Sequence, residues 1–345
     1  MRHVVSILIP AYQAQLWLRD TLESAIAQTY PWKEIIVVDD GSTDSTLSIA
    51  RHYKTASLKV VTQPNSGASA ARNKALSLAQ GDYIQWLDAD DLLAPDKLSR
   101  QLQDTECGMT SQILLSSAFG TFFIRPKKAK FSPHALWQDL EPIDFLLTIF
   151  TQNLWMNPAV WLVSRKLTEL AGPWDERLSL DDDGEYFSRI VAASEHIKFI
   201  PDAKSYYRQH NPRSLSRSVT EQACQSLFLS LSLRIKQLRS LEDSERTRAA
   251  SIKLLQTWLD YFYPEKEELL RQVYELAQDL GGTLSSPKIS WKYLPINALF
   301  GWKTTKRIRN IVSNTKLRAH VRLDQLFASL SHPIERISLR PVKCG

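Results

Sequence analysis

The sequence predicts an α/β protein built on a mostly parallel sheet, and three observations support that class. Residues 35–38 (IIVV) form an apolar run without helical or alternating period, which is typical of an interior strand covered on both faces. Strand-like and helix-like segments alternate over residues 4–88, as in chains that wind around a parallel sheet. Two of the strand-like segments end in clustered carboxylates, and open α/β sheets bind their ligands where such strands end.

The first part of the chain supplies the elements of this sheet. Residues 4–10 (VVSILIP) predict a strand, and residues 18–28 predict a helix because Leu18, Leu22 and Ala25 share one helical face. The same alternation then repeats. The further predicted elements are a strand at 35–39, a helix at 44–53, a strand at 58–61, a helix at 68–79 and a strand at 82–88.

Beyond Pro95 the alternation loosens, and we expect an α+β half followed by helices. Residues 220–280 have a helical pattern, and LGGTLSSP at 280–287 marks a linker or domain edge. The elements expected between these regions are a helix at 96–104, strands at 113–117 and 119–124, an apolar segment at 142–150 and a strand at 159–164.

Size and composition indicate a globular protein. The 345 residues are 43% hydrophobic, enough for a large domain with an appendage. The three cysteines lie far apart without a CxxC spacing, which favours free thiols in a reducing compartment and argues against a zinc site. We expect a cytoplasmic protein, because no signal peptide precedes residues 4–10 and no apolar run reaches membrane-spanning length.

Basic charge is concentrated at the end of the chain. From Lys288 onward there are twelve Lys or Arg against two acidic residues, a net +10, so the first 287 residues carry −4 of the total +6. Residues 301–323 mix apolar side chains with this basic charge, as interfacial helices do on anionic lipid. A basic helix packed on the acidic main domain is an equally good interpretation. No recognised module suggests a nucleic-acid partner.

Asp39 and Asp40 follow the strand at 35–39 directly. Their only role could be to cap the helix that follows, although Ser42, Thr43 or Asp44 could each cap that helix instead. A carboxylate pair at a strand end can also accept hydrogen bonds from a base and from ribose hydroxyls.

LDADD at 87–91 ends another predicted strand. Three carboxylates within four residues repel one another unless a cation neutralises them, and hard oxygen donors suit Mg²⁺ or Mn²⁺ on a diphosphate. A solvated acidic turn remains an alternative. Because carboxyl ends of parallel strands meet at one edge, both acidic segments are expected to converge there.

Two further segments carry candidate ligand-binding groups. NSGASAARNKAL at 65–76 offers loop amides and Arg72 to a nucleotide or its phosphates, or forms only a polar helix surface. WDERLSLDDDGEYFSRI at 174–190 places Asp182, Asp183 and Glu185 at a helix start, where acidic charge is favourable in any case. Neither GxGxxG nor GxxxxGKS occurs, so dinucleotide-binding and P-loop functions lack support.

Together these motifs resemble glycosyltransferase family 2, inverting enzymes of the glycosyltransferase A fold. The resemblance covers about residues 3–215, and it includes SILIPAYQAQLWLRDTLESAIAQTY besides the segments quoted above. It implies a catalytic domain at 1–218, with a nucleotide-sugar half at 1–105 and an acceptor half at 106–218, followed by a helical extension at 219–345. Gln13 departs from the family, which usually has Asn there.

The resemblance also implies roles for individual residues. Asp39 would bind the base, Asp90 would hold a divalent metal (Mg²⁺ or Mn²⁺), and Asp183 would be the catalytic base. The remaining nucleotide-binding residues would be Pro10, Ala11, Tyr12, Asp40, Arg72 and Asp88, and further candidates for acceptor or diphosphate contacts are Asp182, Glu185, His210 and Arg213.

The implied function is transfer of one sugar from a nucleotide-diphospho-sugar, with a UDP-sugar favoured, to a carbohydrate or lipid-linked hydroxyl. The Gln-x-x-Arg-Trp motif of processive synthases is missing, which favours a single transfer in cell-surface polysaccharide or glycolipid biosynthesis. The expected location is cytoplasmic, or peripheral on the cytoplasmic membrane face. The alternatives are a catalytically silent nucleotide-sugar-binding subunit and a sugar-nucleotidyltransferase.

Overall fold

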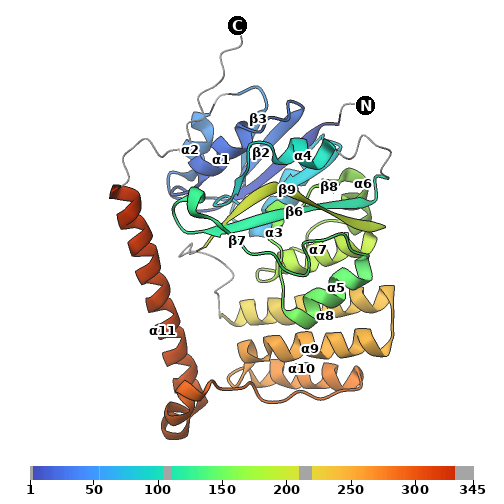
Figure 1. Ribbon diagram of the computed structural model, residues 1–345, viewed down its shortest axis with the longest axis vertical. Helices are drawn as coiled ribbons and strands as arrows, with labels where there is room; N and C mark the ends of the chain where they lie inside the picture. Colours follow the sequence, from blue (N-terminus) through green and yellow to red (C-terminus); the bar gives the residue numbers. More distant parts are fainter. Residues whose placement is uncertain (1–2, 54, 104–109, 210–219, 331–345) are drawn as a thin grey trace.

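A five-stranded sheet forms the first half of the molecule and confirms the predicted α/β class. The computed structural model describes residues 3–53, 55–103, 110–209 and 220–330 (Figure 1). The strand order is β3-β2-β1-β4-β8, in which the first four strands run parallel and the short β8 is antiparallel at the edge. The bounds are β1 (Val5–Ala11), β2 (Lys33–Asp39), β3 (Leu58–Thr62), β4 (Tyr83–Trp86) and β8 (Val163–Ser164).

Helices cover both faces of this sheet, and alternation along the strands explains why. Ile7 of β1 faces a core that includes Leu18 and Leu22, whereas Leu8 faces the core that includes Ala71. The helices involved are α1 (Leu18–Ile26) and α2 (Thr46–His52) on the first face and α3 (Ala68–Leu78) on the second. All three occur where the sequence predicts them.

A second sheet lies across the first and was only partly predicted (Figure 1). Its order is β5-β9-β6-β7, and the long strands β6 and β9 run parallel. The two strands expected at 113–124 form one continuous β6, with a register shift after Ser117. The bounds are β5 (Leu92–Leu93), β6 (Ile113–Phe122), β7 (Lys130–Phe131) and β9 (His196–Arg208).

Short helices connect the two sheets. The strand expected at 159–164 is wrong for its first part, which is a 3-10 turn, η3 (Pro158–Val160); Pro158 occupies its first position because the missing amide is unpaired there in any case. The other helices are α4 (Lys97–Gln103), α5 (Pro142–Gln152), α6 (Arg165–Ala171) and α7 (Asp182–Ala193), with a second 3-10 turn, η2 (Pro126–Lys128).

Three antiparallel helices occupy the region predicted to be helical. They stack below α5 and α7, with α8 nearest to the sheets (Figure 1). Leu227 and Leu255 belong to the same core as Phe145 and Tyr186, so the core continues from residues before 209 to residues after 220. The bounds are α8 (Glu221–Leu241), α9 (Glu245–Phe262) and α10 (Glu267–Asp279).

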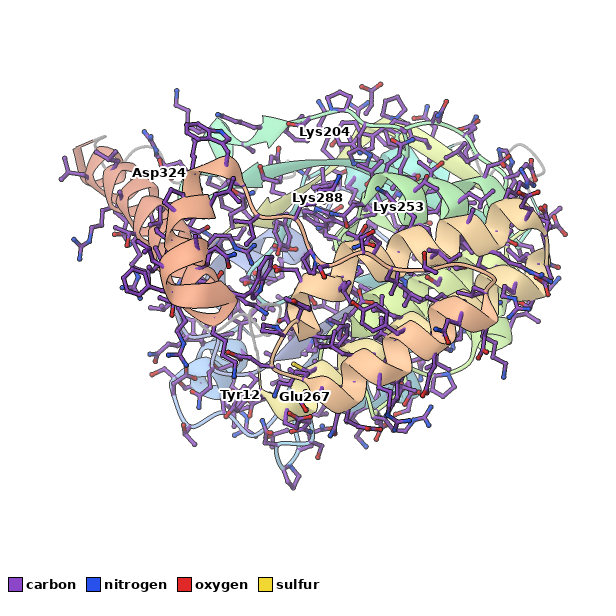
Figure 2. All side chains as sticks on the ribbon, turned by 90° about the horizontal axis from the view of Figure 1, so that it is seen from below. Tyr12, Lys204, Lys253, Glu267, Lys288 and Asp324 are labelled. Atoms are coloured by element: carbon purple, nitrogen blue, oxygen red, sulfur yellow. The ribbon has the colours of Figure 1, made fainter. Side chains whose placement is uncertain are left out.

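The basic segment forms a 3-10 turn, η5 (Trp291–Tyr293), and the helix α11 (Leu294–Leu330), which is interrupted by a non-helical Gly301 with φ of 72°. Lys306 donates hydrogen bonds to the carbonyl oxygens of Asp260 (2.6 Å) and Tyr263 (3.0 Å) at the end of α9. Asp324 accepts a 2.7 Å hydrogen bond from Nε of Arg125. Figure 2 shows α11 beside the stacked helices, with Asp324 on its far part.

Among the described helices, none combines the length and the apolar character needed to cross a bilayer.

Candidate active site

A cavity of about 810 Å³ lies at the carboxyl ends of β1, β2 and β4. Both predicted acidic segments therefore meet at one edge of the sheet, because β1 separates β2 from β4 and all three are parallel. The predicted site residues that line the cavity are Pro10, Ala11, Tyr12, Asp40, Arg72, Asp88, Asp90, Asp182 and Asp183.

The carboxylates of Asp39 and Asp40 have different environments. Asp40 accepts hydrogen bonds from Nε2 of Gln63 (2.8 Å) and from the amides of Ser66 and Gly67 (both 2.9 Å). It therefore fixes the loop that leads into α3. Asp39 accepts a 3.0 Å bond from Thr62 through Oδ2, whereas its buried Oδ1 has no hydrogen-bond partner among the described residues.

These contacts argue against the simpler interpretation, in which Asp39 and Asp40 only cap the next helix. The α2 amide of Thr46 instead donates a 2.9 Å hydrogen bond to the carboxylate of Asp44. Asp39 is not among the cavity-lining residues, but its unpaired oxygen at a strand end fits a donor such as a base N–H.

Arg72 connects two acidic segments of the cavity. Its guanidinium donates to Asp182 (2.6 Å) and to Asp88 (3.0 Å), and it lies over the ring of Trp174 at 4.3 Å. Burial acts to lower the pKa of Arg72, but the charges of Asp182 and Asp88 outweigh it and raise the pKa. The arginine is thus a permanent cation that holds two carboxylates in place.

The LDADD segment divides into cavity-facing and structural acids. Asp88 and Asp90 line the cavity, whereas Asp91 is buried and accepts hydrogen bonds from the Arg208 amide (2.9 Å) and from Asn157 (3.2 Å). Burial and the nearby Asp90 and Asp88 raise the pKa of Asp91 well above its usual value. Arg208 also donates through Nε to the backbone oxygen of Asp90 (2.9 Å), which fixes the turn.

Asp183 occupies the first turn of α7. Its Oδ1 accepts a 2.9 Å hydrogen bond from the Gly184 amide. Burial raises the pKa of Asp183 to about 7, with further contributions from Asp182 and Asp181, while Arg72 acts in the opposite direction. A carboxylate whose pKa lies near neutral pH is suited to accept a proton at that pH.

Side chains of α8 bind the residue that precedes α7 and fix the start of that helix. Asp181, with φ of 60°, accepts hydrogen bonds from Ser230 (2.6 Å) and Arg234 (2.8 Å). A Cβ added at Gly184 would lie 2.2 Å from Oδ1 of Asp181, so only glycine fits there. The helix region after residue 220 therefore positions the turn that carries Asp183.

Among the described site residues that the sequence predicts, Asp39 and Glu185 do not line the cavity. Glu185 is nearly buried and binds Arg189 at 2.7 and 2.9 Å, so its carboxylate supports α7 itself. His210 and Arg213 lie outside the described residues.

The donor set for a metal consists of few protein groups. The described residues contain no cluster of three or more His, Cys, Asp or Glu side chains placed to hold an ion. Asp88 and Asp90 both face the cavity, and Mg²⁺ commonly binds through one or two carboxylates together with phosphate oxygens and water. These two residues thus fit a metal that is shared with a bound diphosphate.

Sequence reasoning missed two arginines of the site. Arg234 lies on the apolar face of α8, between Leu231 and Leu238. A cation on an otherwise apolar helix face is the sequence signal that could have identified it. Arg208 ends β9, a strand whose exposed Lys, Pro and Asp residues hide its period.

The first part of the chain is similar to known proteins. Residues 6–127 match the family described as Glycosyl transferase family 2. TuaG of Bacillus subtilis, named as a teichuronic acid biosynthesis glycosyltransferase, is 44% identical over 103 residues, 29% of this chain and 41% of that protein. An uncharacterized glycosyltransferase of Rickettsia typhi is 29% identical over 228 residues, 63% of this chain and 68% of its own length. An uncharacterized glycosyltransferase of Haemophilus influenzae is 43% identical over 102 residues, and this chain spans only 41% of the length of that protein and of TuaG.

Solved structures share the fold over a longer stretch. Crystal structures of S. aureus TarS residues 1–349 with UDP and with UDP-GlcNAc superpose with TM-scores of 0.61 and 0.60. Sequence identity is 19% and 20%, and each comparison covers 80% of both chains. The likeness confirms the expected glycosyltransferase A-type fold.

Proposed function

We propose that this chain, of which residues 6–127 match glycosyltransferase family 2, is a metal-dependent inverting glycosyltransferase that transfers one sugar from a nucleotide-diphospho-sugar to a hydroxyl. The observation that carries the proposal is one cavity shared by Asp183, with its pKa raised to about 7, and the carboxylates of Asp88 and Asp90. A proton acceptor and a potential diphosphate-metal site thus face the same space.

Asp183 has the role of general base. It accepts the proton of the acceptor hydroxyl while the acceptor oxygen forms a bond to C1 of the sugar. The bond between C1 and the diphosphate oxygen breaks, and the nucleoside diphosphate leaves with the electron pair. Attack from the face opposite the leaving group inverts the configuration at C1.

The donor is assigned to the part of the cavity next to the sheet. Asp39 offers its unpaired oxygen to the base, and Tyr12 with Asp40 borders the nucleotide. Asp88 and Asp90 would hold Mg²⁺ or Mn²⁺, which stabilises negative charge on the departing diphosphate when bound. The TarS structures with UDP and UDP-GlcNAc favour a UDP-sugar.

The biological context is assigned by similarity. TuaG is named for teichuronic acid biosynthesis, which favours a role in cell-surface polysaccharide or glycolipid biosynthesis. The acceptor would be a carbohydrate or lipid-linked hydroxyl at the cytoplasmic side of the membrane. The exposed cations Lys303 and Arg307 on α11, together with exposed Ile311 and Leu323, support attachment to an anionic surface.

The decisive experiment is a donor panel with purified protein and Mg²⁺ or Mn²⁺. We expect one nucleotide sugar to stabilise the protein thermally and to release its nucleoside diphosphate, and Asp183→Asn to retain the stabilisation but lose the release. Binding without release in the unchanged protein would instead identify a silent binding subunit. Formation of a nucleotide sugar from a nucleoside triphosphate and a sugar phosphate would identify a nucleotidyltransferase.

A further inference from the structure

Part of the cavity wall is apolar and comes largely from helices; we call this part the apolar compartment. Ile149 of α5 contributes to this wall, as do Leu154 and Trp155 in the segment after α5. Leu254 and Trp258 of α9 contribute from the helical region that follows residue 220. Trp155 is 48% exposed although it belongs to a cluster with Phe119 and Tyr207 at ring distances of 5.0 and 4.9 Å.

A nucleotide diphosphate does not account for this compartment. The donor groups assigned above lie on the sheet side, where Asp40, Arg72 and Asp88 supply charge. Asp183 and Phe187 both come from α7, on the helical side of the cavity, and both line it. Beyond a hydroxyl held at Asp183, the wall is therefore suited to an apolar group, because aromatic and aliphatic surfaces gain free energy when a ligand removes them from water.

A second, smaller cavity adjoins this compartment. A smaller cavity of about 200 Å³ is lined by Thr257, Asp260 and Tyr261, and it shares Asn153 and Trp258 with the main one. Trp258 thus borders both spaces. Asn153, which directly follows α5, borders both spaces as well.

The smaller cavity lies where the basic helix is attached. Asp260, which lines the smaller cavity, accepts a 2.5 Å hydrogen bond from Arg309 of α11, and its carbonyl oxygen accepts one from Lys306 at 2.6 Å. Figure 2 shows α11 lying next to the stacked helices at this end of the molecule. An apolar group that extended past Trp258 into the smaller cavity would lie near the helix that carries the exposed cations.

We propose that the acceptor is amphipathic, with its reactive hydroxyl at Asp183 and an apolar group in the compartment lined by Ile149, Leu154, Trp155, Leu254 and Trp258. This inference rests on the proposed function, since it assigns the acceptor class of the same site. The helical region after residue 220 then selects the acceptor, while the sheet edge binds the donor.

The test uses matched pairs of n-octyl and methyl glycosides of glucose, galactose and N-acetylglucosamine, below the concentration at which the octyl compounds form micelles. Binding is measured by calorimetry with nucleoside diphosphate present, and transfer is measured separately with the best donor. We expect octyl members to bind at least about tenfold more tightly than their methyl partners, because each buried methylene contributes to binding.

Two variants address the compartment from different elements. Trp258→Ala on α9 and Trp155→Ala after α5 should each reduce the octyl preference several-fold, and Trp155→Ala should fold because the side chain is about half exposed. The matched control is Trp291→Ala, which removes an indole that is 74% exposed and does not line the cavity. Trp291→Ala should keep the full octyl preference. If the preference arose from nonspecific adsorption to exposed indoles, Trp291→Ala would reduce it.

The outcomes separate this inference from the proposed function. Release of nucleoside diphosphate without any octyl preference overturns the apolar acceptor site and leaves the transferase in place. An octyl preference that depends on Trp258 in a protein that cleaves no donor supports the compartment and overturns the transferase. Equal octyl preference in all three variants and the unchanged protein also overturns the site.

Discussion

Arg72 donates a 2.6 Å hydrogen bond to Asp182, a residue 110 positions further along the chain. The same guanidinium binds Asp88, so α3, the turn after β4 and the start of α7 are fixed relative to one another. Both partners of the 2.6 Å pair are largely buried, and breaking such a pair leaves an uncompensated charge. The donor side of the cavity and the turn that carries Asp183 are therefore held together by one side chain.

The first prediction concerns the general base. Asp183→Asn should reduce transfer by about 10²- to 10⁴-fold with little change in the donor dissociation constant, because the amide cannot accept the hydroxyl proton. The measurement is single-turnover transfer beside donor calorimetry. Asp182→Asn is the matched variant. It should reduce transfer less and weaken donor binding, since it disturbs Arg72. Full activity of Asp183→Asn with an inactive Asp182→Asn would move the base to Asp182.

The second prediction concerns pH. Because the pKa of Asp183 is raised to about 7, its carboxyl group is protonated and unable to act as base below that pH. The ratio kcat/KM should rise with pH about tenfold per unit on the acid side and level off above about pH 8. A profile from about pH 5 to about pH 9, with unfolding measured at each pH, checks this. A flat profile in a protein that stays folded contradicts the assignment of Asp183.

The third prediction concerns the contribution of α8. Arg234→Met removes the cation that binds the largely buried Asp181 at 2.8 Å. The loss should lower the free energy of unfolding by about 3 to 5 kcal/mol and reduce kcat more than donor affinity. Arg239→Met, on the same helix but in an exposed pair with Asp243, is the control and should leave unfolding unchanged. If both variants unfolded alike, Arg234 would have no special role in positioning α7.

The fourth prediction concerns the metal. Asp90→Ala should weaken nucleoside diphosphate binding in the presence of Mg²⁺ or Mn²⁺ by at least about tenfold, and chelation should abolish transfer. Calorimetry with and without metal provides the readout. Asp96→Ala, which changes a partly exposed carboxylate paired with Arg100, should behave like the unchanged protein. Normal turnover of Asp90→Ala in the presence of EDTA would exclude a metal held by this residue.

The fifth prediction concerns α11. The protein should co-sediment with anionic vesicles at low salt, and Lys303→Glu with Arg307→Glu should release most of it, since each basic residue near such a surface contributes about 1 kcal/mol. Neutral vesicles and high salt serve as conditions in which binding should be lost. Lys253→Glu with Arg271→Glu changes two exposed cations on α9 and α10 and is the matched control. Equal loss in both double variants would show attraction by overall charge alone.

Local sequence determined the first sheet and its motifs. The apolar runs at β1 and β2 and the helical face of α1 depend on neighbouring residues alone, so their periods identify them. The order of the parallel strands then brings Asp40 and Asp88 to one edge, which is why both acidic segments could be assigned to one site. The second sheet is harder to predict from the sequence, because the residues of β9 alternate irregularly between buried and exposed.

What only the tertiary structure decided is the use of each side chain within the site. Residue type and spacing selected Asp39 and Asp40, and the family resemblance selected Asp183. Neither indicated that Asp40 is bound by loop amides while one oxygen of Asp39 has no partner among the described residues. Such differences depend on which distant groups approach, since burial and hydrogen bonding arise from packing.

The helical region after residue 220 is the clearest case of this division. Its sequence determined that it is helical, because Leu227, Leu231 and Leu238 recur on one face of α8. Whether α8 and α9 stand apart or complete a site is a matter of packing between segments far apart in sequence. The structure packs them against α5 and α7, and in doing so it brings Arg234 to Asp181 and Trp258 to the cavity wall. No local period carries that information, because the free energy of those contacts belongs to the assembled core.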